Sequence, residues 1–292
     1  MTMRTSNVVK TAGRMAALAI VAAACGRAEA SPNDARNTAN PAEPRVVTVI
    51  ARDFAFEAPS QVPAGLVTFE LQNRGNALHH VSLVRLDDGK TLADVYAALR
   101  GGASGPPPAW MHDMGGPNAP DPGHNSNATM FLAPGTYALL CWVDIPDHVP
   151  HVMKGMAKQI TVTPAAVPAA AATPAGDITM RLNDYSFRLS RAITAGEHTI
   201  RVENGAAQSH EVELIKLAPG KTTQDLMNWF QTMAGPPPAS AIGGISGLGR
   251  GQVQAFSHTF TPGTYVLICF LPDAGDGKPH FMHGMIQTIT VS

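Results

Sequence analysis

The 292-residue chain contains one long segment that occurs twice in similar form, with equivalent residues about 130 positions apart. D-F-A-F-E-A-P-S-Q-V-P-A-G, from Asp53, matches D-Y-S-F-R-L-S-R-A-I-T-A-G, from Asp184, and P-G-T-Y-A-L-L-C, ending at Cys141, matches P-G-T-Y-V-L-I-C, ending at Cys269. The matched stretches keep their order and a nearly constant offset, which indicates a duplicated domain. The repeat therefore predicts two domains of the same fold, at residues 45–163 and 177–292.

Within each copy, apolar and polar residues alternate over short runs that Gly, Pro and Asn separate. The runs V-T-F-E-L at 67–71 and I-T-M-R-L at 178–182 are examples. This period of two is typical of strands that bury one face, and about seven such runs in each copy favour a Greek-key β-sandwich. One short helix per copy is also expected, because Thr91 and Thr223 precede helical patterns as capping residues.

The N-terminal residues have the pattern of an export signal. Residues 1–30 combine a basic start with the apolar run M-A-A-L-A-I-V-A-A-A, which is too short to span a membrane comfortably. Cys25 follows this run and is the candidate lipidation site of a bacterial lipoprotein; the alternative is soluble release after Ala30. We expect residues 31–44 to be a tether and the Ala/Pro-rich residues 164–176 to link the domains. The mature protein is then expected in the periplasm or outer cell envelope, with a lipid anchor as its only membrane attachment.

Each copy contains side chains that bind a soft metal, in the same order. Two imidazoles, one thiolate and one thioether form the ligand set of a blue, or type 1, copper site, in which methionine is the weak axial ligand. The candidate ligands are His79, Cys141, His151 and Met156 in the first copy and His210, Cys269, His280 and Met285 in the second. The repeat argues against His80, His148 and His283 as ligands, because the other copy has no histidine at the equivalent position.

Alternatives to a metal site remain open for these residues. Taken singly, a buried cysteine, a histidine in a turn and a core methionine are ordinary structural residues. Cysteines outside the cytoplasm also usually pair, although a disulfide between Cys141 and Cys269 would require the two domains to meet at those equivalent points. The recurrence of all four residue types in both copies favours the metal site.

The motifs around these residues resemble the plastocyanin branch of the cupredoxin family. The similar stretches are P-G-T-Y-x-L-x-C, then P-H-x3-G-M-x3-I-T-V, and upstream N-x-G-x3-H-x-V from Asn73, with N-G-A-A-Q-S-H-E-V from Asn204 as its counterpart. The resemblance covers nearly all of each copy. It implies an all-β chain of two tandem Greek-key cupredoxin-like β-sandwiches, with one type 1 copper in each copy held by the four candidate ligands.

The chain departs from this family in the spacing of its candidate ligands. Nine residues separate Cys141 from His151 and ten separate Cys269 from His280, whereas plastocyanins have only a few. Two interpretations follow. Either each longer loop bulges outward and returns the histidine to its place, since both loops are rich in turn formers, or the domains kept the fold and lost the metal.

The composition of the chain and the residues next to the two cysteines limit the classes of function that the chain can have. Charged residues make up 15% of the chain and the net charge is −1, so we expect no nucleic-acid partner. The family's reductases and oxidases link copper centres through a histidine beside the ligand cysteine; here the neighbours are Leu140, Trp142, Ile268 and Phe270. We therefore expect no enzyme, but a protein that passes single electrons between redox partners in the cell envelope.

Two other functions stay open. The first is a metal-free binding or structural module. The second is a periplasmic copper-handling protein that exchanges copper with other copper-handling proteins of the envelope. In that case a Met/His-rich segment of the first copy would hold copper(I), and its candidate ligands are Met111, His112, Met114, His124, His148 and Met153.

Overall fold

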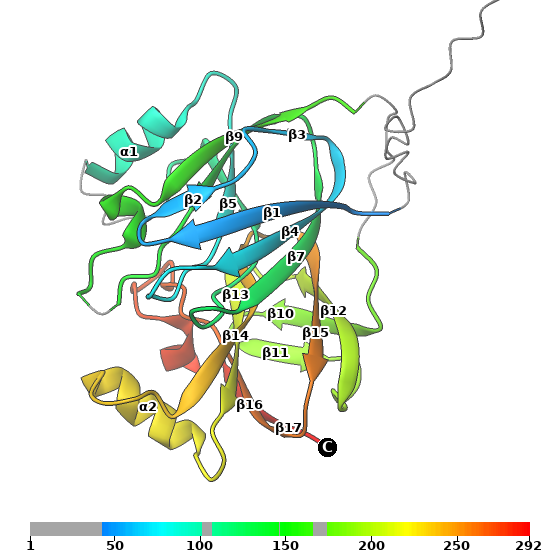
Figure 1. Cartoon of the computed structure of the whole chain (residues 1–292), viewed down its shortest axis with the longest axis vertical. Helices are drawn as coiled ribbons and strands as arrows, with labels where there is room; N and C mark the ends of the chain where they lie inside the picture. The colour runs from blue at the N-terminus through cyan, green and yellow to red at the C-terminus, as the bar shows by residue number, and fades with distance from the viewer. Residues whose placement is uncertain (1–42, 101–106, 146, 166–173) are drawn as a thin grey trace, which may run out of the picture. The chain divides into compact units, whose positions relative to one another are not determined.

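Each copy of the repeat folds into a β-sandwich with one α-helix, as the alternating pattern predicted (Figure 1). The first copy comprises β1 (Arg45–Arg52), β2 (Ala55–Glu57), β3 (Gln61–Pro63), β4 (Gly65–Asn73), β5 (Ser82–Leu86), α1 (Leu92–Arg100), β6 (Met111–Gly115), β7 (Asn125–Leu132), β8 (Gly135–Leu140) and β9 (Ala157–Thr163). The second comprises β10 (Ile178–Asn183), β11 (Ser186–Leu189), β12 (Gly196–Asn204), β13 (His210–Leu217), α2 (Thr223–Thr232), β14 (Ala239–Leu248), β15 (Val253–Phe260), β16 (Gly263–Ile268) and β17 (Ile286–Val291).

The computed structural model describes residues 43–100, 107–145, 147–165 and 174–292, which belong to one compact unit. The predicted signal peptide, the lipidation site Cys25 and most of the predicted tether and linker lie outside these residues. Among the helices that are described, none is long and apolar enough to cross a membrane.

Two sheets run through both copies. One has the strand order β11-β10-β12-β15-β7-β4-β1-β2 and the other β17-β16-β13-β14-β6-β5-β8-β9-β3. The copies meet where β15 pairs with β7 and where β14 pairs with β6, both antiparallel. In each case the paired strands are equivalent in the repeat. The copies are therefore related like the subunits of a two-fold symmetric dimer.

The second sheet is covered on both faces, which explains its unbroken apolar strands. In β4, of the first sheet, every second residue is buried, as expected when one face of a strand is more exposed. By contrast, Val95 of α1 packs with Val84 and Leu140, and Leu226 of α2 packs with Ile268, on the side of the second sheet away from the sandwich core. The strands that lead to the two cysteines are thus held from both sides.

The P-G-T-Y phrase forms a tyrosine corner ahead of each cysteine strand. Tyr137 donates its hydroxyl hydrogen to the carbonyl of Ala133 at 2.8 Å, and Tyr265 donates to Thr261 at 3.0 Å. Gly135 has φ = 152°, a conformation that residues with a side chain seldom adopt. The phrase therefore recurs because it fixes the start of the strand that ends at the cysteine.

The helix caps follow the prediction in one copy and differ by one residue in the other. In the first copy, Thr91 and Asp94 are hydrogen-bonded at the start of α1, as expected. In the second copy, the sequence predicted Thr223 as the cap, but the structure has Thr222 in that role. The hydroxyl of Thr222 accepts the backbone N–H of Asp225, whose carboxylate bonds back, because only Thr222 lies three residues before that carboxylate.

Candidate metal centres

Three of the predicted ligands in the first copy converge on one point. His79 Nδ1 lies 3.1 Å from His151 Nδ1 and 4.0 Å from Cys141 Sγ, and His151 Nδ1 lies 3.6 Å from the same sulfur. None of the three side chains is exposed to solvent. Cys141 is a free thiol, so the alternative of a disulfide between the copies is wrong.

The second copy repeats this arrangement. His210 Nδ1 lies 3.0 Å from His280 Nδ1, which is 3.3 Å from Cys269 Sγ. Cys269 is also a buried free thiol, and the three potential ligand atoms lie within 4.8 Å of one another. Each copy therefore holds its own cluster of two imidazoles and one thiol.

The distances in the first cluster fit a single metal ion. Metal–nitrogen bonds of about 2.0 Å and metal–sulfur bonds of about 2.3 Å are usual for first-row metals. An ion at these bond lengths can contact all three atoms at once, because each pair of atoms lies no farther apart than two such bonds laid end to end. Two imidazoles and one thiolate are the donor set of blue copper sites. The donor set thus fits copper.

Backbone hydrogen bonds close the long loop after Cys141. The N–H of His151 bonds the carbonyl of Val143 at 2.9 Å, Val152 bonds the carbonyl of Cys141 at 2.7 Å, and Met156 bonds that of His151 at 3.0 Å. The second copy has the same bonds, from His280 to Leu271, from Phe281 to Cys269 and from Met285 to His280. Both loops therefore bulge outward and return the histidine to the cysteine, the first of the two interpretations of the spacing.

The two predicted axial methionines lie in the core beside these loops. Met156 and Met285 are completely buried. The backbone N–H of Cys141 bonds the carbonyl of Met156 at 3.2 Å, and that of Cys269 bonds the carbonyl of Met285 at 3.1 Å. This places each methionine next to its cysteine, and its role as a ligand is part of the function proposed below.

A carboxylate stands behind the first histidine of each cluster. Asp53 Oδ1 lies 2.6 Å from His79 Nε2, and Asp184 Oδ1 lies 3.0 Å from His210 Nε2. A carboxylate accepts the proton of Nε2, which leaves the lone pair of Nδ1 free toward the cluster, as in many metal sites. Neither aspartate was predicted from the sequence as a site residue, although both begin the matched stretches of the repeat.

Burial keeps the cluster uncharged in the absence of a metal. It raises the pKa of Cys141 to about 12 and raises that of Cys269 as well. It lowers the pKa of His151 to about 4 and that of His280 to about 4. Burial would also raise the pKa of Asp53, but hydrogen bonds from Asn76, His79 and Ala77 lower it to about 2. The aspartate is thus ionised beside neutral imidazoles, and a metal cation would displace the proton of the thiol.

Aromatic side chains cover the second histidine of each cluster. The ring of Phe54 lies 4.6 Å from that of His151, and the ring of Tyr185 lies 5.6 Å from that of His280. The Nε2 atoms of both histidines are buried and have no hydrogen-bond partner among the described residues. The carboxylate of Asp273 lies 3.8 Å from Nε2 of His280, and both histidines are completely buried.

The other histidines that the sequence singled out lie outside the clusters. His80 uses both ring nitrogens in hydrogen bonds, at 2.9 Å with the N–H of Trp142 and at 3.2 Å with Asn118. His148 is exposed, and His283 pairs with the carboxylate of Asp276 at 3.1 Å. These placements agree with the argument from the repeat that none of the three is a ligand.

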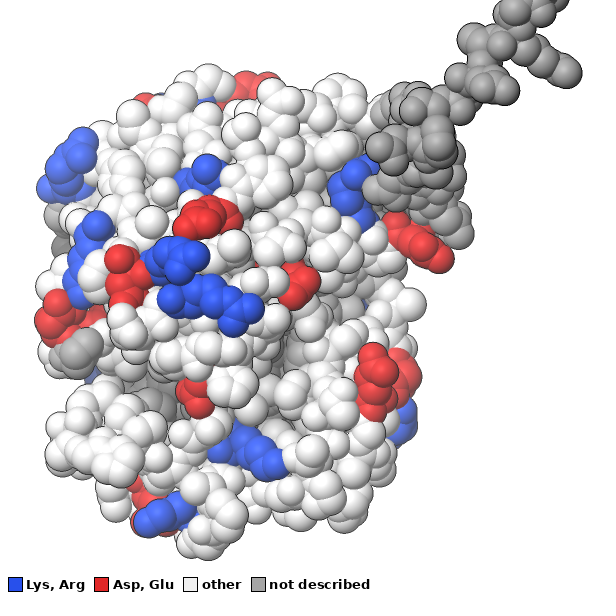
Figure 2. All heavy atoms as spheres, in the orientation of Figure 1, with Lys and Arg blue, Asp and Glu red and all other residues white. Residues whose placement is uncertain are grey.

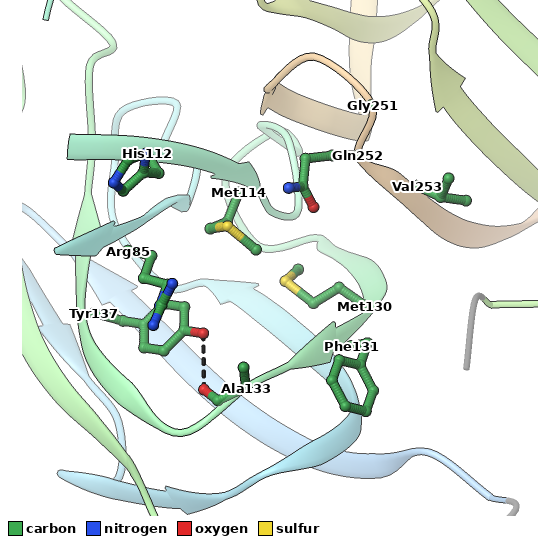
Figure 3. A pocket seen from close by; sticks show the side chains of 10 residues that line it. All are labelled: Arg85, His112, Met114, Met130, Phe131, Ala133, Tyr137, Gly251, Gln252 and Val253. Atoms are coloured by element: carbon green, nitrogen blue, oxygen red, sulfur yellow. Dashed lines mark hydrogen bonds between the residues drawn. The ribbon is translucent and has the colours of Figure 1, made fainter. Parts of the chain in front are cut away.

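The Met/His-rich segment of the first copy does not gather its side chains in one place. Met111 packs on the helix side of the sheet and Met114 on the core side, because residues three apart on a strand point to opposite faces. His112 pairs with Asp87 at 2.8 Å, and His124 bonds a carbonyl of its own loop. A cavity of about 450 Å³ lies where the copies meet, and Met114 and His112 line it together with Arg85 and residues 251–253 (Figure 3).

Charges of both signs are mixed on the face of the molecule that Figure 2 shows. Figure 2 shows Lys and Arg side chains interspersed with Asp and Glu over the face in view, without a region of a single sign. On that face of the described residues, the surface has no basic patch of the kind that binds nucleic acids.

The chain thus has the fold of two tandem cupredoxin-like β-sandwiches, with a candidate copper site in each copy. No family model and no curated protein matches the chain. Among solved structures, it is similar to reduced auracyanin from Roseiflexus castenholzii, with 23% identity over 41% of this chain and 97% of that one, at a TM-score of 0.28. It is also similar to auracyanin A, a "blue" copper protein from Chloroflexus aurantiacus, with 19% identity over 41% of this chain and 100% of that one, at a TM-score of 0.29. It is also similar to the blue copper oxidase from Nitrosomonas europaea, with 16% identity over 85% of this chain and 86% of that one, at a TM-score of 0.26.

Proposed function

We propose that the protein is an exported two-domain blue copper protein that transfers single electrons. One observation carries the proposal: in each copy two imidazole nitrogens and one thiol sulfur converge within a buried site, with a carboxylate behind the first imidazole. The proposed ligands are His79, Cys141, His151 and Met156 for one copper and His210, Cys269, His280 and Met285 for the other.

The residues around each site suit a one-electron carrier. Bound copper would supply the Cu(II)/Cu(I) couple. The chain holds the ligands by backbone hydrogen bonds on a sheet packed from both sides, and buries them. Ligands that are held in place and buried would keep the rearrangement between the two oxidation states small, which favours fast electron transfer.

We also propose that the protein is not itself an oxidase or reductase. The residues on either side of the ligand cysteines are Leu140, Trp142, Ile268 and Phe270, none of which can ligate a neighbouring copper centre. The test is oxygen uptake by the copper-loaded, chemically reduced protein. Turnover of oxygen to water at a rate above that of free copper would contradict this part of the proposal.

The proposed location and partners follow from the N-terminal sequence. Export and lipidation at Cys25 would place the two domains in the cell envelope, where redox or copper-handling proteins are the expected partners. The mass of the mature N-terminus tests this directly. Lipidation predicts a diacylglycerol-modified Cys25 and release of the protein from membranes in Cys25→Ser; an unmodified N-terminus near Ala30 would contradict it.

A visible spectrum tests copper binding. We expect Cu(II) to give an intense blue or green thiolate charge-transfer band, with two coppers bound per chain. Cys141→Ser and Cys269→Ser should each remove one copper together with its share of the band, and the double variant should be colourless. Cys25→Ser is the matched control and should leave the band intact. No band in the parent protein would overturn the proposal and leave a metal-free module.

A further inference from the structure

The residues that follow the first histidine of each cluster face each other across the two copies. His80 and Glu211 occupy equivalent positions, one residue after His79 and His210. The backbone N–H of Trp142, next to the cysteine of the first site, donates to His80 Nε2 at 2.9 Å. In the same way, the N–H of Phe270, next to the cysteine of the second site, donates to Glu211 Oε1 at 2.9 Å. Each of these side chains is thus tied to its own candidate copper site.

Asn118 joins the two side chains. Because His80 Nε2 accepts a hydrogen bond, Nδ1 carries the ring proton and donates it to Asn118 Oδ1 at 3.2 Å. On its other side, Asn118 Nδ2 donates to Glu211 Oε2 at 3.4 Å. The three residues are buried, with exposed fractions of 8%, 2% and 4%. Four hydrogen bonds therefore run without a break from the residue after one ligand cysteine to the residue after the other.

The position of Asn118 is fixed by further hydrogen bonds. Its Nδ2 also donates to the carbonyl of Val212 at 3.3 Å, and its own carbonyl accepts the hydroxyl hydrogen of Ser126 at 2.7 Å. The equivalent position in the second copy is Ser246, whose hydroxyl donates to the carbonyl of Val81 at 2.7 Å. The serine makes the same kind of contact across the copies, but its side chain is too short to bridge His80 and Glu211.

We infer that His80, Asn118 and Glu211 form an electron path between the two metal sites, so that one chain passes electrons internally from one site to the other. The inference rests on the proposed function. Electrons tunnel more readily through covalent and hydrogen-bonded atoms than through atoms that are only in van der Waals contact, and this path crosses from one copy to the other by hydrogen bonds. One electron leaves the reduced site, which becomes Cu(II), and converts Cu(II) of the other site to Cu(I). No bond breaks and no proton has to move.

The experiment measures the internal transfer in the full copper-loaded chain. A Met285→Leu background changes the axial position of the second site, so that the two sites differ in potential and in band position. A light pulse that delivers less than one electron per chain is followed at both bands. We expect one site to be reduced first and the electron then to reach the other in a fast phase whose rate does not depend on protein concentration.

Two variants on the path and one beside it decide the outcome. Asn118→Leu keeps the approximate shape of the side chain and removes its hydrogen bonds, including those to His80 and Glu211, so the fast phase should be lost while both bands remain. Glu211→Gln is the second test, because it replaces one of the two accepting oxygens by an NH₂ group, which then faces either the N–H of Phe270 or the amide of Asn118, donor against donor; it too should lose the fast phase. Ser246→Ala removes the equivalent contact between the copies, to the carbonyl of Val81, which is not one of the four hydrogen bonds of the path, and should keep that phase.

The failures are distinguishable. If the fast phase survives in Asn118→Leu and in Glu211→Gln, with both bands intact, the path is overturned but the copper sites are not. If the parent protein has both bands but no fast phase, the path is likewise overturned and the copper sites are not. Loss of the fast phase in Ser246→Ala as well would show that the path depends on the interface as a whole and would also overturn the assignment. If copper gives no band in the parent protein, the proposed function fails and the path fails with it.

Discussion

The carboxylate of Asp53 should determine how tightly the first site holds copper. Its Oδ1 lies 2.6 Å from Nε2 of His79, a length typical of a charge-assisted hydrogen bond. A bond to a charged group contributes about 1.5–3 kcal/mol, which corresponds to about 10–100-fold in affinity. Loss of such partners weakens metal binding by about the same factor in other proteins. We therefore expect Asp53→Ala, in a Cys269→Ser background that leaves only the first site, to bind copper about 10–100-fold more weakly.

Two measurements check this prediction. Competition with a chromophoric copper(I) chelator gives the affinity, and ¹⁵N NMR of the metal-free protein gives the protonated nitrogen of His79, which should be Nε2 in the parent and a mixture in the variant. Asp87→Ala is the matched control, because it removes a carboxylate that lies 2.8 Å from an exposed histidine ring outside the cluster. Unchanged affinity together with an unchanged tautomer in Asp53→Ala would refute the reasoning.

Three further predictions concern packing, pH and stability. In Gly75→Ala the new Cβ would stand 2.6 Å from His79 Nε2 and closer still to Asp53 Oδ1, so the band and EPR signal of the first site should change and those of the second should not. Glu213 is buried, and burial raises its pKa well above 4.5; between pH 4.5 and this raised pKa only the unfolded chain ionises, so stability falls as pH rises through that range. Glu213→Gln should therefore raise Tm at pH 8 relative to the parent and lose this advantage near pH 4; calorimetry giving equal differences at both pH values would count against it. Tyr137→Phe loses one hydrogen bond and should destabilise the fold by about 1 kcal/mol in urea unfolding without altering the visible band; a changed band would tie that tyrosine to the site.

The fold and the order of the candidate ligands were predictable because both depend on local sequence patterns that occur twice. Alternation of apolar residues indicates strands wherever it appears, and the repeat supplied an internal comparison that separated His79 from His80. The long loops were also readable in part, since their turn-forming residues favour an outward bulge. The structure shows how the histidine returns: a hydrogen bond from His151 to Val143 closes the loop.

The contacts between distant segments could not be read from the sequence. Asp53 lies 26 residues before His79, and no local pattern says that the turn after β1 reaches the loop before β5. The pairing of β7 with β15 is likewise set by how two surfaces fit. The difference between His80 and Glu211 was used to exclude His80 as a ligand. The same difference gives His80 a proton that it donates to Asn118 and gives Glu211 an oxygen that accepts a hydrogen bond from Asn118.

The pairing of equivalent edges makes each half of the molecule the natural partner of the other. A half produced alone would present unpaired strand edges at β6 and β7, and such edges recruit another strand. The fused chain behaves like a dimer whose subunits never separate, at a fixed one-to-one ratio. Each half therefore always faces a non-identical neighbour, so the two sequences are free to diverge in complementary ways that a dimer of identical subunits could not maintain.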